Sequence, residues 1–249
     1  MDKSSKLDIT LEEQRKSWNT WNRATREQKL DLVSERQAAV VLQWCSSLGR
    51  GAMEILDLGC GSGWMSERLL PFGKVTGVDL ADETIARARK RAPRIRFLSG
   101  DVFDADLPAG HFDLVVSLEV LSHVRDQPAF LERIASLLKP GGHLMLATQN
   151  RYVLERCDDI GGPKPGQIRR WVDARQLRRL LAPDYDLLEL TSVLPVGNRG
   201  LLRLVNSHKL NRLLALCVPA RLTERAKERL LLGHTLLALA RKRERKTAT

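Results

Sequence analysis

The order of apolar and polar residues predicts helices at the start of the chain and alternating strands and helices after residue 50. Residues 8–48 carry an apolar stripe at helical spacing, and Thr10 with Glu13 forms a capping-box pattern at its start. Short apolar runs typical of buried strands follow at residues 53–58, 75–78, 95–98, 112–117 and 143–147. This alternation predicts an α/β fold with a doubly wound, mostly parallel sheet.

Beyond residue 150 the pattern is less regular, but it contains two further candidate strands, at residues 185–193 and 231–240. A leucine- and arginine-rich stretch of helical texture separates them. We expect an N-terminal helical lid (1–50) and one larger domain (51–249). The larger domain includes a helical insertion that caps the substrate (195–230) and a basic tail (241–249).

The composition is that of a single globular domain. A chain of 249 residues with 43% hydrophobic and 29% charged residues buries one substantial core. The N-terminus has no apolar run typical of a signal, and no apolar stretch is long enough to span a bilayer. The four cysteines match no metal-ligand spacing, so we expect reduced thiols in a cytoplasmic protein.

The net charge of +11 is concentrated near the C-terminus. From Arg199 onwards, thirteen Lys or Arg stand against three Glu. Such a region attracts phosphates, nucleic acid or anionic lipid head groups. The alternative is a set of solvated helix faces followed by a charged tail. Because leucines are interleaved with the basic residues, the region is also amphipathic and suits contact with a membrane surface.

A glycine-rich loop follows the first predicted strand and precedes a helix. Gly59, Gly61 and Gly63 have the spacing GxGxG, whereas the dinucleotide-binding loop has GxGxxG. Glycines allow a tight turn and a close approach of the backbone to a ligand. Asp57, two residues before the loop, disfavours a pyrophosphate and suits a cationic ligand. A nicotinamide-dependent reductase is therefore disfavoured.

Carboxylates also close the next two predicted strands. Asp79 is placed to accept hydrogen bonds from ribose hydroxyls. Asp101 is placed to accept one from an adenine amino group, with Val102 beside the ring. Any one of these residues can instead be a helix N-cap. Together with Asp57, they favour a cationic nucleoside as the ligand.

These motifs resemble, in order and spacing, those of class I S-adenosylmethionine-dependent methyltransferases. The segments that carry the resemblance are 55–63, 78–79, 100–101, 111–116 and 138–142. The resemblance implies a seven-stranded sheet whose last strand is antiparallel, with S-adenosylmethionine as cofactor. It implies that Asp57 and the glycines hold the methionine part, Asp79 the ribose and Asp101 the adenine. Leu80, Val102 and Leu118 are implied as further cofactor contacts.

The stretch 117–124 contains the candidates for a general base, Glu119 and His123. It resembles the ExxEH element of ubiquinone-type O-methyltransferases, but Ser122 replaces the second Glu, and we assign no metal. Residues 148–151 resemble the Thr-x-Asn-Arg element of the same group. His123 has two interpretations, a base that activates a hydroxyl and a structural histidine beneath the cofactor.

Four residues are candidates for binding the acceptor: Trp18, Trp21, Tyr152 and Arg169. The spacing of Trp18 and Trp21 fits a lid over the cofactor and, equally, an ordinary packing stripe. Arg169 follows a Gly/Pro-rich loop and, with the guanidinium of Arg170, suits an anionic group. A solvent-facing helix entry is the alternative for this pair.

The sequence therefore predicts methyl transfer to a small-molecule acceptor, hydrophobic or anionic, and at a hydroxyl rather than an amine. The basic C-terminal region makes an RNA or other nucleic-acid methyltransferase the first alternative. Against it, the fourth strand lacks the Asn/Asp-Pro-Pro-aromatic loop of base-amino methylases, and aromatic residues make up only 5% of the chain. A non-catalytic cofactor-binding scaffold is the second alternative. The oligomeric state stays open.

Overall fold

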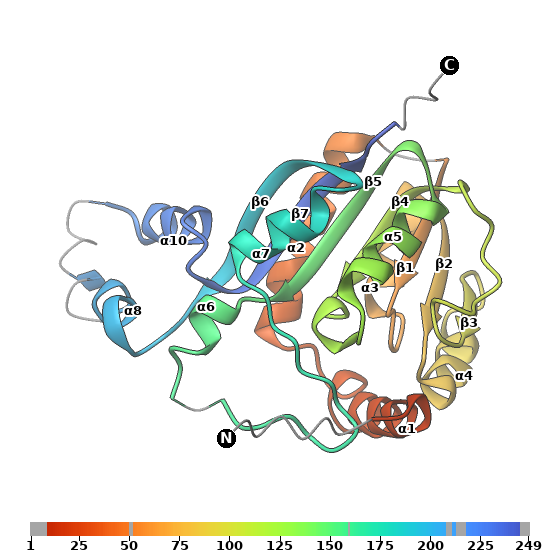
Figure 1. Cartoon of the computed structure of the whole chain (residues 1–249), viewed down its shortest axis with the longest axis horizontal. Helices are drawn as coiled ribbons and strands as arrows, with labels where there is room; N and C mark the ends of the chain where they lie inside the picture. The colour runs from red at the N-terminus through yellow and green to blue at the C-terminus, as the bar shows by residue number, and fades with distance from the viewer. Residues whose placement is uncertain (1–8, 50–51, 159, 208–210, 213–217, 245–249) are drawn as a thin grey trace.

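The computed structural model describes residues 9–49, 52–158, 160–207, 211–212 and 218–244. Its centre is a seven-stranded sheet in the order β3-β2-β1-β4-β5-β7-β6 (Figure 1). The neighbours from β3 to β5 are parallel, whereas β7 is antiparallel to both β5 and β6. This confirms the expected doubly wound sheet and its antiparallel last strand.

The strands follow the apolar runs of the sequence closely. Their bounds are β1 Met53–Leu58, β2 Gly73–Asp79, β3 Arg96–Ser99, β4 Phe112–Leu118, β5 Leu138–Gln149, β6 Tyr185–Pro195 and β7 Gly233–Lys242. Strand β5 begins earlier than expected because the Pro-Gly-Gly segment after Lys139, which has the sequence of a turn, stays in the strand. A shift of register between Phe112 and Leu114 accommodates it.

Helices cover both faces of the sheet, and each face has its own buried cluster. One cluster includes Met65 and Ile85, and the other includes Phe130 and Leu177. The helices after the N-terminal segment are α3 Trp64–Leu69, α4 Asp82–Arg91, α5 Gln127–Leu137, α6 Arg151–Leu154, α7 Ala174–Leu181, α8 Gly200–Val205 and α10 Ala220–Arg229. Two 3₁₀ turns, η2 Leu70–Phe72 and η3 Leu121–His123, accompany them.

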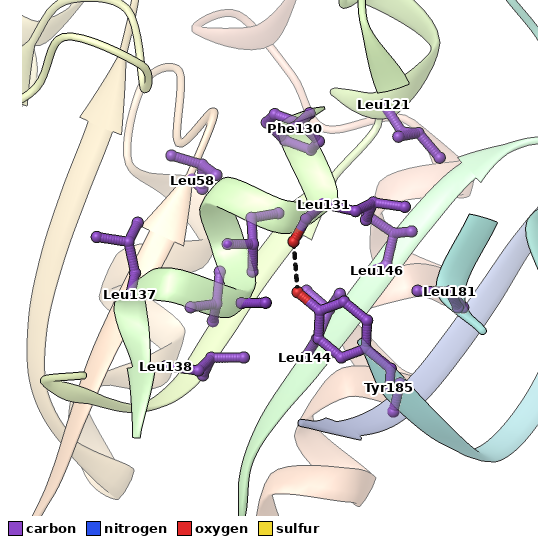
Figure 2. Close-up of a cluster of buried hydrophobic side chains, with 14 of the residues drawn as sticks. Leu58, Leu121, Phe130, Leu131, Leu137, Leu138, Leu144, Leu146, Leu181 and Tyr185 are labelled. Carbon is purple, nitrogen blue, oxygen red and sulfur yellow. Dashed lines mark hydrogen bonds between the residues drawn. The ribbon is translucent and has the colours of Figure 1, made fainter. Parts of the chain in front are cut away.

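Tyr185, the first residue of β6, closes the core between the sheet and α5. Its ring is 1% exposed, and its hydroxyl donates a hydrogen bond to the carbonyl oxygen of Leu131 at 2.8 Å. Figure 2 shows this bond among the surrounding leucines. Because the hydroxyl has a partner, the tyrosine fills the core without leaving a buried polar atom unsatisfied. The contact fixes β6, at the edge of the sheet, against α5.

Residues 8–48, expected to be helical, form two helices with a break between them. Helix α1 (Leu11–Trp21) begins at the predicted capping box and continues as a π-helical turn, η1 (Asn22–Arg26). A second helix, α2 (Leu32–Leu48), starts at Asp31, whose carboxylate accepts a hydrogen bond from the Ser34 N–H at 2.8 Å. This N-cap has an extended backbone, so the chain changes direction between the two helices.

The leucine- and arginine-rich insertion extends from the edge of the sheet, beyond β6 (Figure 1). Helix α10 is held against β6, where the Ser192 hydroxyl donates to the carbonyl oxygen of Glu228 at 2.8 Å. The carboxylate of Glu228 pairs with Arg36 of α2 at 2.7 Å. None of the described helices is both long and apolar enough to cross a membrane.

The structure describes three of the four cysteines. Cys45, Cys60 and Cys157 are free thiols. Cys217 lies outside the described residues. No three His, Cys, Asp or Glu side chains come together as a possible metal site within the ranges that the structure describes.

Candidate active site

A cavity of about 980 Å³ lies at the carboxyl ends of the parallel strands. Strand order reverses there, because β1 leads to β2 on one side and has β4 on the other. Open α/β sheets bind their ligands at this position. The walls include α1 and η1, the glycine loop, the strand ends, and the loop of residues 160–171.

The glycine loop brings backbone into direct contact with neighbouring elements. A Cβ on Gly61 would lie 2.9 Å from the Asn22 side-chain oxygen, and one on Gly63 would lie 2.6 Å from the Phe97 ring. Both glycines have positive φ, +51° and +79°. Gly59 and Gly61 line the cavity, whereas Gly63 is not among its lining residues and turns the chain into α3.

The three strand-end carboxylates all line this cavity, together with Leu80 and Val102. Asp57 accepts a hydrogen bond from the Ser66 hydroxyl at 2.5 Å, and burial raises its pKa to about 7. Asp79 accepts from the N–H groups of Gly61 and Ala81, both at 2.8 Å. Burial also raises the pKa of Asp79. Carboxyls removed from water in this way favour a cationic or hydrogen-bond-donating ligand.

Asp101 lies just beyond β3 and is less enclosed than the other two carboxylates. One of its oxygens accepts a hydrogen bond from the Phe103 N–H at 3.1 Å. The other carboxylate oxygen has no hydrogen-bond partner among the described residues. Asp57, Asp79 and Asp101 therefore form one acidic wall across three neighbouring strands, as the motif predicts.

Leu118 and Glu119 follow one another at the end of β4, and both line the cavity. Glu119 has a left-handed backbone with φ of +64°, which is strained for a residue other than glycine. One of its carboxyl oxygens accepts hydrogen bonds from Gln37 at 2.5 Å and from Thr235 at 3.1 Å. Its enclosed position raises the pKa to about 7. These contacts tie β4 to α2 and β7.

His123 ends η3 and faces the same cavity. Its Nδ1 lies 2.7 Å from the carbonyl oxygen of Ile168, which can only accept a hydrogen bond. Nδ1 therefore carries the proton, and the lone pair of the neutral ring is on Nε2. Burial lowers the pKa of His123. The ring of Trp18 packs edge-on against the imidazole, with 4.7 Å between the ring centroids.

Of the residues expected to bind the acceptor, Trp18, Trp21 and Arg169 line the cavity. The guanidinium of Arg169 donates to the carbonyl oxygens of Gly161 and Gly162 and lies 4.6 Å from the Trp171 ring centroid. The Arg169 side chain thus makes its contacts within the loop of residues 160–171 and stabilises the conformation of that loop. The two tryptophans contact each other edge-on at 5.8 Å and form part of the wall beneath α1.

The structure does not bring Tyr152 to the cavity. The residue is 39% exposed, and its ring lies 4.1 Å from the guanidinium carbon of Arg156, one helical turn later on the surface.

The Asn150-Arg151 pair has a structural role. Asn150 donates to the carbonyl oxygens of Leu231 and Gly233, at 2.9 Å each. The Arg151 side chain pairs with Asp173. The Asn-Arg pair therefore joins β5 to the start of β7 and to α7.

The insertion at 195–230 is also separate from the cavity. None of its described residues lines the cavity, although we expected the insertion to cap the substrate. The loop of residues 160–171 and helix α1 cover the site instead, and they contact each other. A Cβ on Gly166 would lie 2.6 Å from the carbonyl oxygen of Glu13. An amphipathic pattern shows that a helix has an apolar face, but not which element that face covers.

Several cavity residues carry no motif in the sequence. Arg26, Gln37, Gln149 and His234 line the site from η1, α2, β5 and β7. Residues so far apart in sequence meet only through the tertiary fold. A partial signal exists for Gln149, which follows the fifth apolar run at the same edge as the acidic strand ends.

Comparison with known proteins agrees with this geometry. A family model described as a methyltransferase domain matches residues 15–186. A ubiquinone biosynthesis O-methyltransferase of Cereibacter sphaeroides is 32% identical over 183 residues, covering 70% of this chain and 73% of the relative. The protein of the same name from Coxiella burnetii is 33% identical over 183 residues, covering 64% and 77%.

Solved structures share the fold at lower identity. The N-methyltransferase NodS from Bradyrhizobium japonicum, in complex with S-adenosyl-L-homocysteine, has a TM-score of 0.65 at 19% identity and covers 93% of this chain and 100% of its own. The 1,6-didemethyltoxoflavin-N1-methyltransferase of Burkholderia thailandensis has a TM-score of 0.60 at 22% identity, covering 92% and 87%. The family match and the acidic, glycine-lined cavity lead to one conclusion: the chain belongs to the S-adenosylmethionine-dependent methyltransferases and is an enzyme that uses this cofactor.

Proposed function

We propose that the protein methylates a hydroxyl group of a small, largely apolar acceptor, with His123 as the general base. The observation that carries the proposal is the hydrogen bond between His123 Nδ1 and the Ile168 carbonyl, 2.7 Å long. The cofactor, when bound, supplies a methyl group on a positively charged sulfur. A hydroxyl acceptor must lose its proton during transfer, whereas an amine needs only a free lone pair.

The surroundings of His123 suit this role. Because Nδ1 donates to a backbone carbonyl, Nε2 is left as the proton acceptor in the neutral ring. No hydrogen bond to Nε2 comes from any residue within the described ranges. Trp18 and the 160–171 loop cover the ring and restrict water, and alignment of donor and acceptor in such a closed site supplies much of the rate.

The apolar side chains that line the cavity with His123 support this character of the acceptor. Trp18, Leu154, Ile160, Ile168 and Trp171 all line the cavity, and their rings and aliphatic groups suit a flat or alkylated apolar molecule. The relatives named as ubiquinone biosynthesis O-methyltransferases support oxygen as the methylated atom.

We assign Glu119 a positioning role within this reaction. Its carboxyl group is held by Gln37 and Thr235, so it fixes the end of β4 against α2 and β7. A cationic cofactor in the same cavity would favour the ionised form of the carboxyl group, whose pKa is about 7 without a ligand.

A matched pair of acceptors tests the proposal. The purified protein is incubated with methyl-labelled S-adenosylmethionine and either an alkyl-substituted catechol or the aniline of the same carbon skeleton. We expect labelled ether from the catechol and little or no labelled amine. Turnover of anilines with none of catechols or other hydroxyl acceptors would overturn the proposed oxygen specificity and leave the methyltransferase family unaffected.

We also propose that helix α10 places the protein on an anionic membrane surface. Leu222 and Leu230 are 53% and 69% exposed, and Arg225 and Arg229 lie on the same face of the helix. Apolar side chains flanked by arginines match a lipid surface, with leucines reaching the acyl chains and guanidinia the phosphates. The opposite side of α10 is fixed to the domain through Glu228.

Sedimentation with vesicles tests this contact. We expect the protein to bind vesicles containing phosphatidylglycerol, to bind phosphatidylcholine vesicles weakly, and to be released by high salt. Changing Leu222 and Leu230 to Ser should abolish binding. Leu188→Ser, which removes a 50% exposed leucine from β6, serves as the control. The proposal would be overturned if the protein did not bind anionic vesicles, or if the Leu222/Leu230 variant bound them as well as the wild type. Binding to RNA but not to vesicles would indicate the nucleic-acid alternative.

A further inference from the structure

Gln149 is a polar residue of the cavity that has no part in the acidic wall. It is the last residue of β5, it is partly buried, and it lines the cavity. In the sheet, β5 lies on the side of β4 that is opposite to β1, β2 and β3, whose ends carry the acidic wall. At about 4.8 Å between neighbouring strands, Gln149 stands roughly 10 Å from β1 and roughly 20 Å from β3. This part of the cavity is therefore left to the acceptor.

The side-chain oxygen of Gln149 already has a partner. It accepts a hydrogen bond from the hydroxyl of Ser122, a residue with no exposed surface. This contact fixes the amide with its oxygen on Ser122 and its nitrogen on the other side. The serine stands where the ExxEH element has its second glutamate. An ionised glutamate can only accept hydrogen bonds, so it would turn the amide nitrogen towards itself.

The side-chain nitrogen of Gln149 remains available to a ligand. It carries two N–H donors, and neither has a hydrogen-bond partner among the residues that the structure describes. A donor that faces a partly closed cavity lowers the free energy of a complex when the ligand supplies the missing acceptor atom. An amide N–H is neutral and donates to the lone pairs of ether, carbonyl or hydroxyl oxygens. It therefore selects a ligand by an oxygen atom and not by a charge.

Ser122 also connects Gln149 to the proposed base. It directly precedes His123 in η3, so the amide is fixed to the turn that carries the imidazole. The imidazole itself is oriented by the carbonyl oxygen of Ile168. An oxygen bound by Gln149 is thus expected close to the hydroxyl that His123 deprotonates.

We propose that the amide of Gln149 binds a second oxygen of the acceptor, which lies beside the methylated hydroxyl and is not itself methylated. This inference rests on the proposed function, because it concerns the acceptor of that reaction. Gln149 then determines specificity: it favours acceptors with two neighbouring oxygen substituents over acceptors with one. Ser122 is the positioning residue that sets the orientation of the amide.

Two phenols that differ in one oxygen atom test the assignment. One carries a methoxy group beside its hydroxyl, and the other carries an ethyl group of similar size in that place. Each has a single hydroxyl, so the methylated atom is the same in both. We expect the wild type to have the lower KM for the methoxyphenol. Gln149→Leu should raise this KM by roughly 3- to 10-fold, as for a lost neutral hydrogen bond, and leave the KM for the ethylphenol unchanged.

Gln149→Glu separates the two ends of the amide. At pH 8 its carboxylate keeps an oxygen for the Ser122 hydroxyl but has no N–H to donate. This variant should therefore also lose the preference for the methoxyphenol. The matched control is Gln43→Leu, the same change at an exposed position of α2 that is not among the residues lining the cavity. It should keep the wild-type KM for both phenols.

Several outcomes would overturn the inference. An equal loss of activity towards both phenols in the two Gln149 variants would show that the residue only supports η3. A wild type without a preference for the methoxyphenol, or a preference that survives both substitutions, would exclude the proposed contact. If only the matching anilines are methylated, the oxygen specificity of the proposed function fails, and the same comparison with the anilines decides the role of Gln149. If nothing is methylated, calorimetry of the two phenols with the S-adenosylhomocysteine complex decides by the same preference.

Discussion

The imidazole of His123 and the backbone carbonyl of Ile168 lie 2.7 Å apart and join two segments that are 45 residues apart in the chain. One segment is the turn after β4, and the other is the loop that covers the cavity. The contact fixes both the ring orientation and its tautomer. It therefore links closure of the site to the state of the proposed base.

Replacing His123 tests its role directly. We expect His123→Ala to lower kcat by about 10²-fold or more, because the acceptor hydroxyl loses its proton acceptor. The dissociation constant of S-adenosylhomocysteine should stay unchanged. The matched control is His143→Ala, which removes a histidine from the middle of β5 that is not among the residues lining the cavity. Unchanged turnover in the His123 variant would leave this histidine with a structural role.

The pH dependence of the reaction follows from the environment of the same ring. Burial lowers the pKa of His123 below its ordinary value of 6.5, and only the neutral ring accepts a proton. We expect kcat/KM for the acceptor to fall as the pH is lowered, with half of it lost below pH 6.5. A half-loss of kcat/KM above pH 6.5 would contradict this assignment. Asp104→Ala, in an exposed position, should show the same profile as the wild type.

Asp79 is expected to be indispensable for cofactor binding. Its carboxylate closes β2 and is oriented by the N–H groups of Gly61 and Ala81. Asp79→Ala removes the acceptor proposed for the ribose hydroxyls and also the partner of the glycine loop. Calorimetry with S-adenosylhomocysteine should show no detectable binding, while the exposed Asp106→Ala binds as the wild type does. Retained affinity in the Asp79 variant would place the ribose elsewhere.

Ionisation of Glu119 should lower the unfolding free energy of the ligand-free protein as the pH rises. Its folded-state pKa is raised from 4.5 to about 7, so between these values the folded state binds more protons than the unfolded state. The corresponding stability is present below pH 4.5 and is lost as the pH rises through 7. This loss amounts to at most roughly 3 kcal/mol.

Glu119→Gln removes this titration. Urea unfolding at pH 5 and pH 8 should show a smaller loss of unfolding free energy for the variant than for the wild type. Asp57, whose pKa is also raised to about 7, contributes equally to both proteins. Identical losses in the two proteins would contradict the raised pKa of Glu119.

Substitutions at two glycines distinguish the destabilisation caused by backbone strain from that caused by steric crowding. Gly63 and Gly110 both have positive φ, at +79° and +60°. A Cβ on Gly63 would meet the Phe97 ring at 2.6 Å, whereas one on Gly110 would meet nothing within 4 Å. We expect Gly63→Ala to lower the unfolding free energy by roughly 1–3 kcal/mol more than Gly110→Ala. Equal losses in urea unfolding would show that Phe97 moves aside freely.

The sequence was sufficient to predict the sheet and the acidic wall of the cavity. Each of Asp57, Asp79 and Asp101 lies within three residues of the end of an apolar run, so the local pattern alone places them at one edge of a parallel sheet. His123 was predictable for the same reason, because it lies a few residues after β4. In all four cases the signal is short in sequence and tied to a strand end.

The rest of the cavity depends on packing over long separations. Arg26 and Gln37 come from two helices whose relative orientation is set at Asp31, and the helical pattern of residues 8–48 continues through that break without a clear interruption. His234 enters from β7, far along the chain. The amphipathic pattern of the 195–230 insertion suggested a substrate cap, but none of its described residues lines the cavity.

Strand β7 runs opposite to its neighbours, and this direction separates two regions of the molecule. It starts at Gly233 and His234 beside the cavity and ends at Lys242. The ammonium group of Lys242 donates to the carbonyl oxygen of Leu138, at the end of the strands opposite to the cavity. Nine residue steps at about 3.3 Å each put these ends roughly 30 Å apart. Arg241 and Arg243, which pair with Asp186, therefore stand remote from methyl transfer. An anion docked on them would act as a non-competitive ligand, able to occupy the protein at the same time as the cofactor and acceptor.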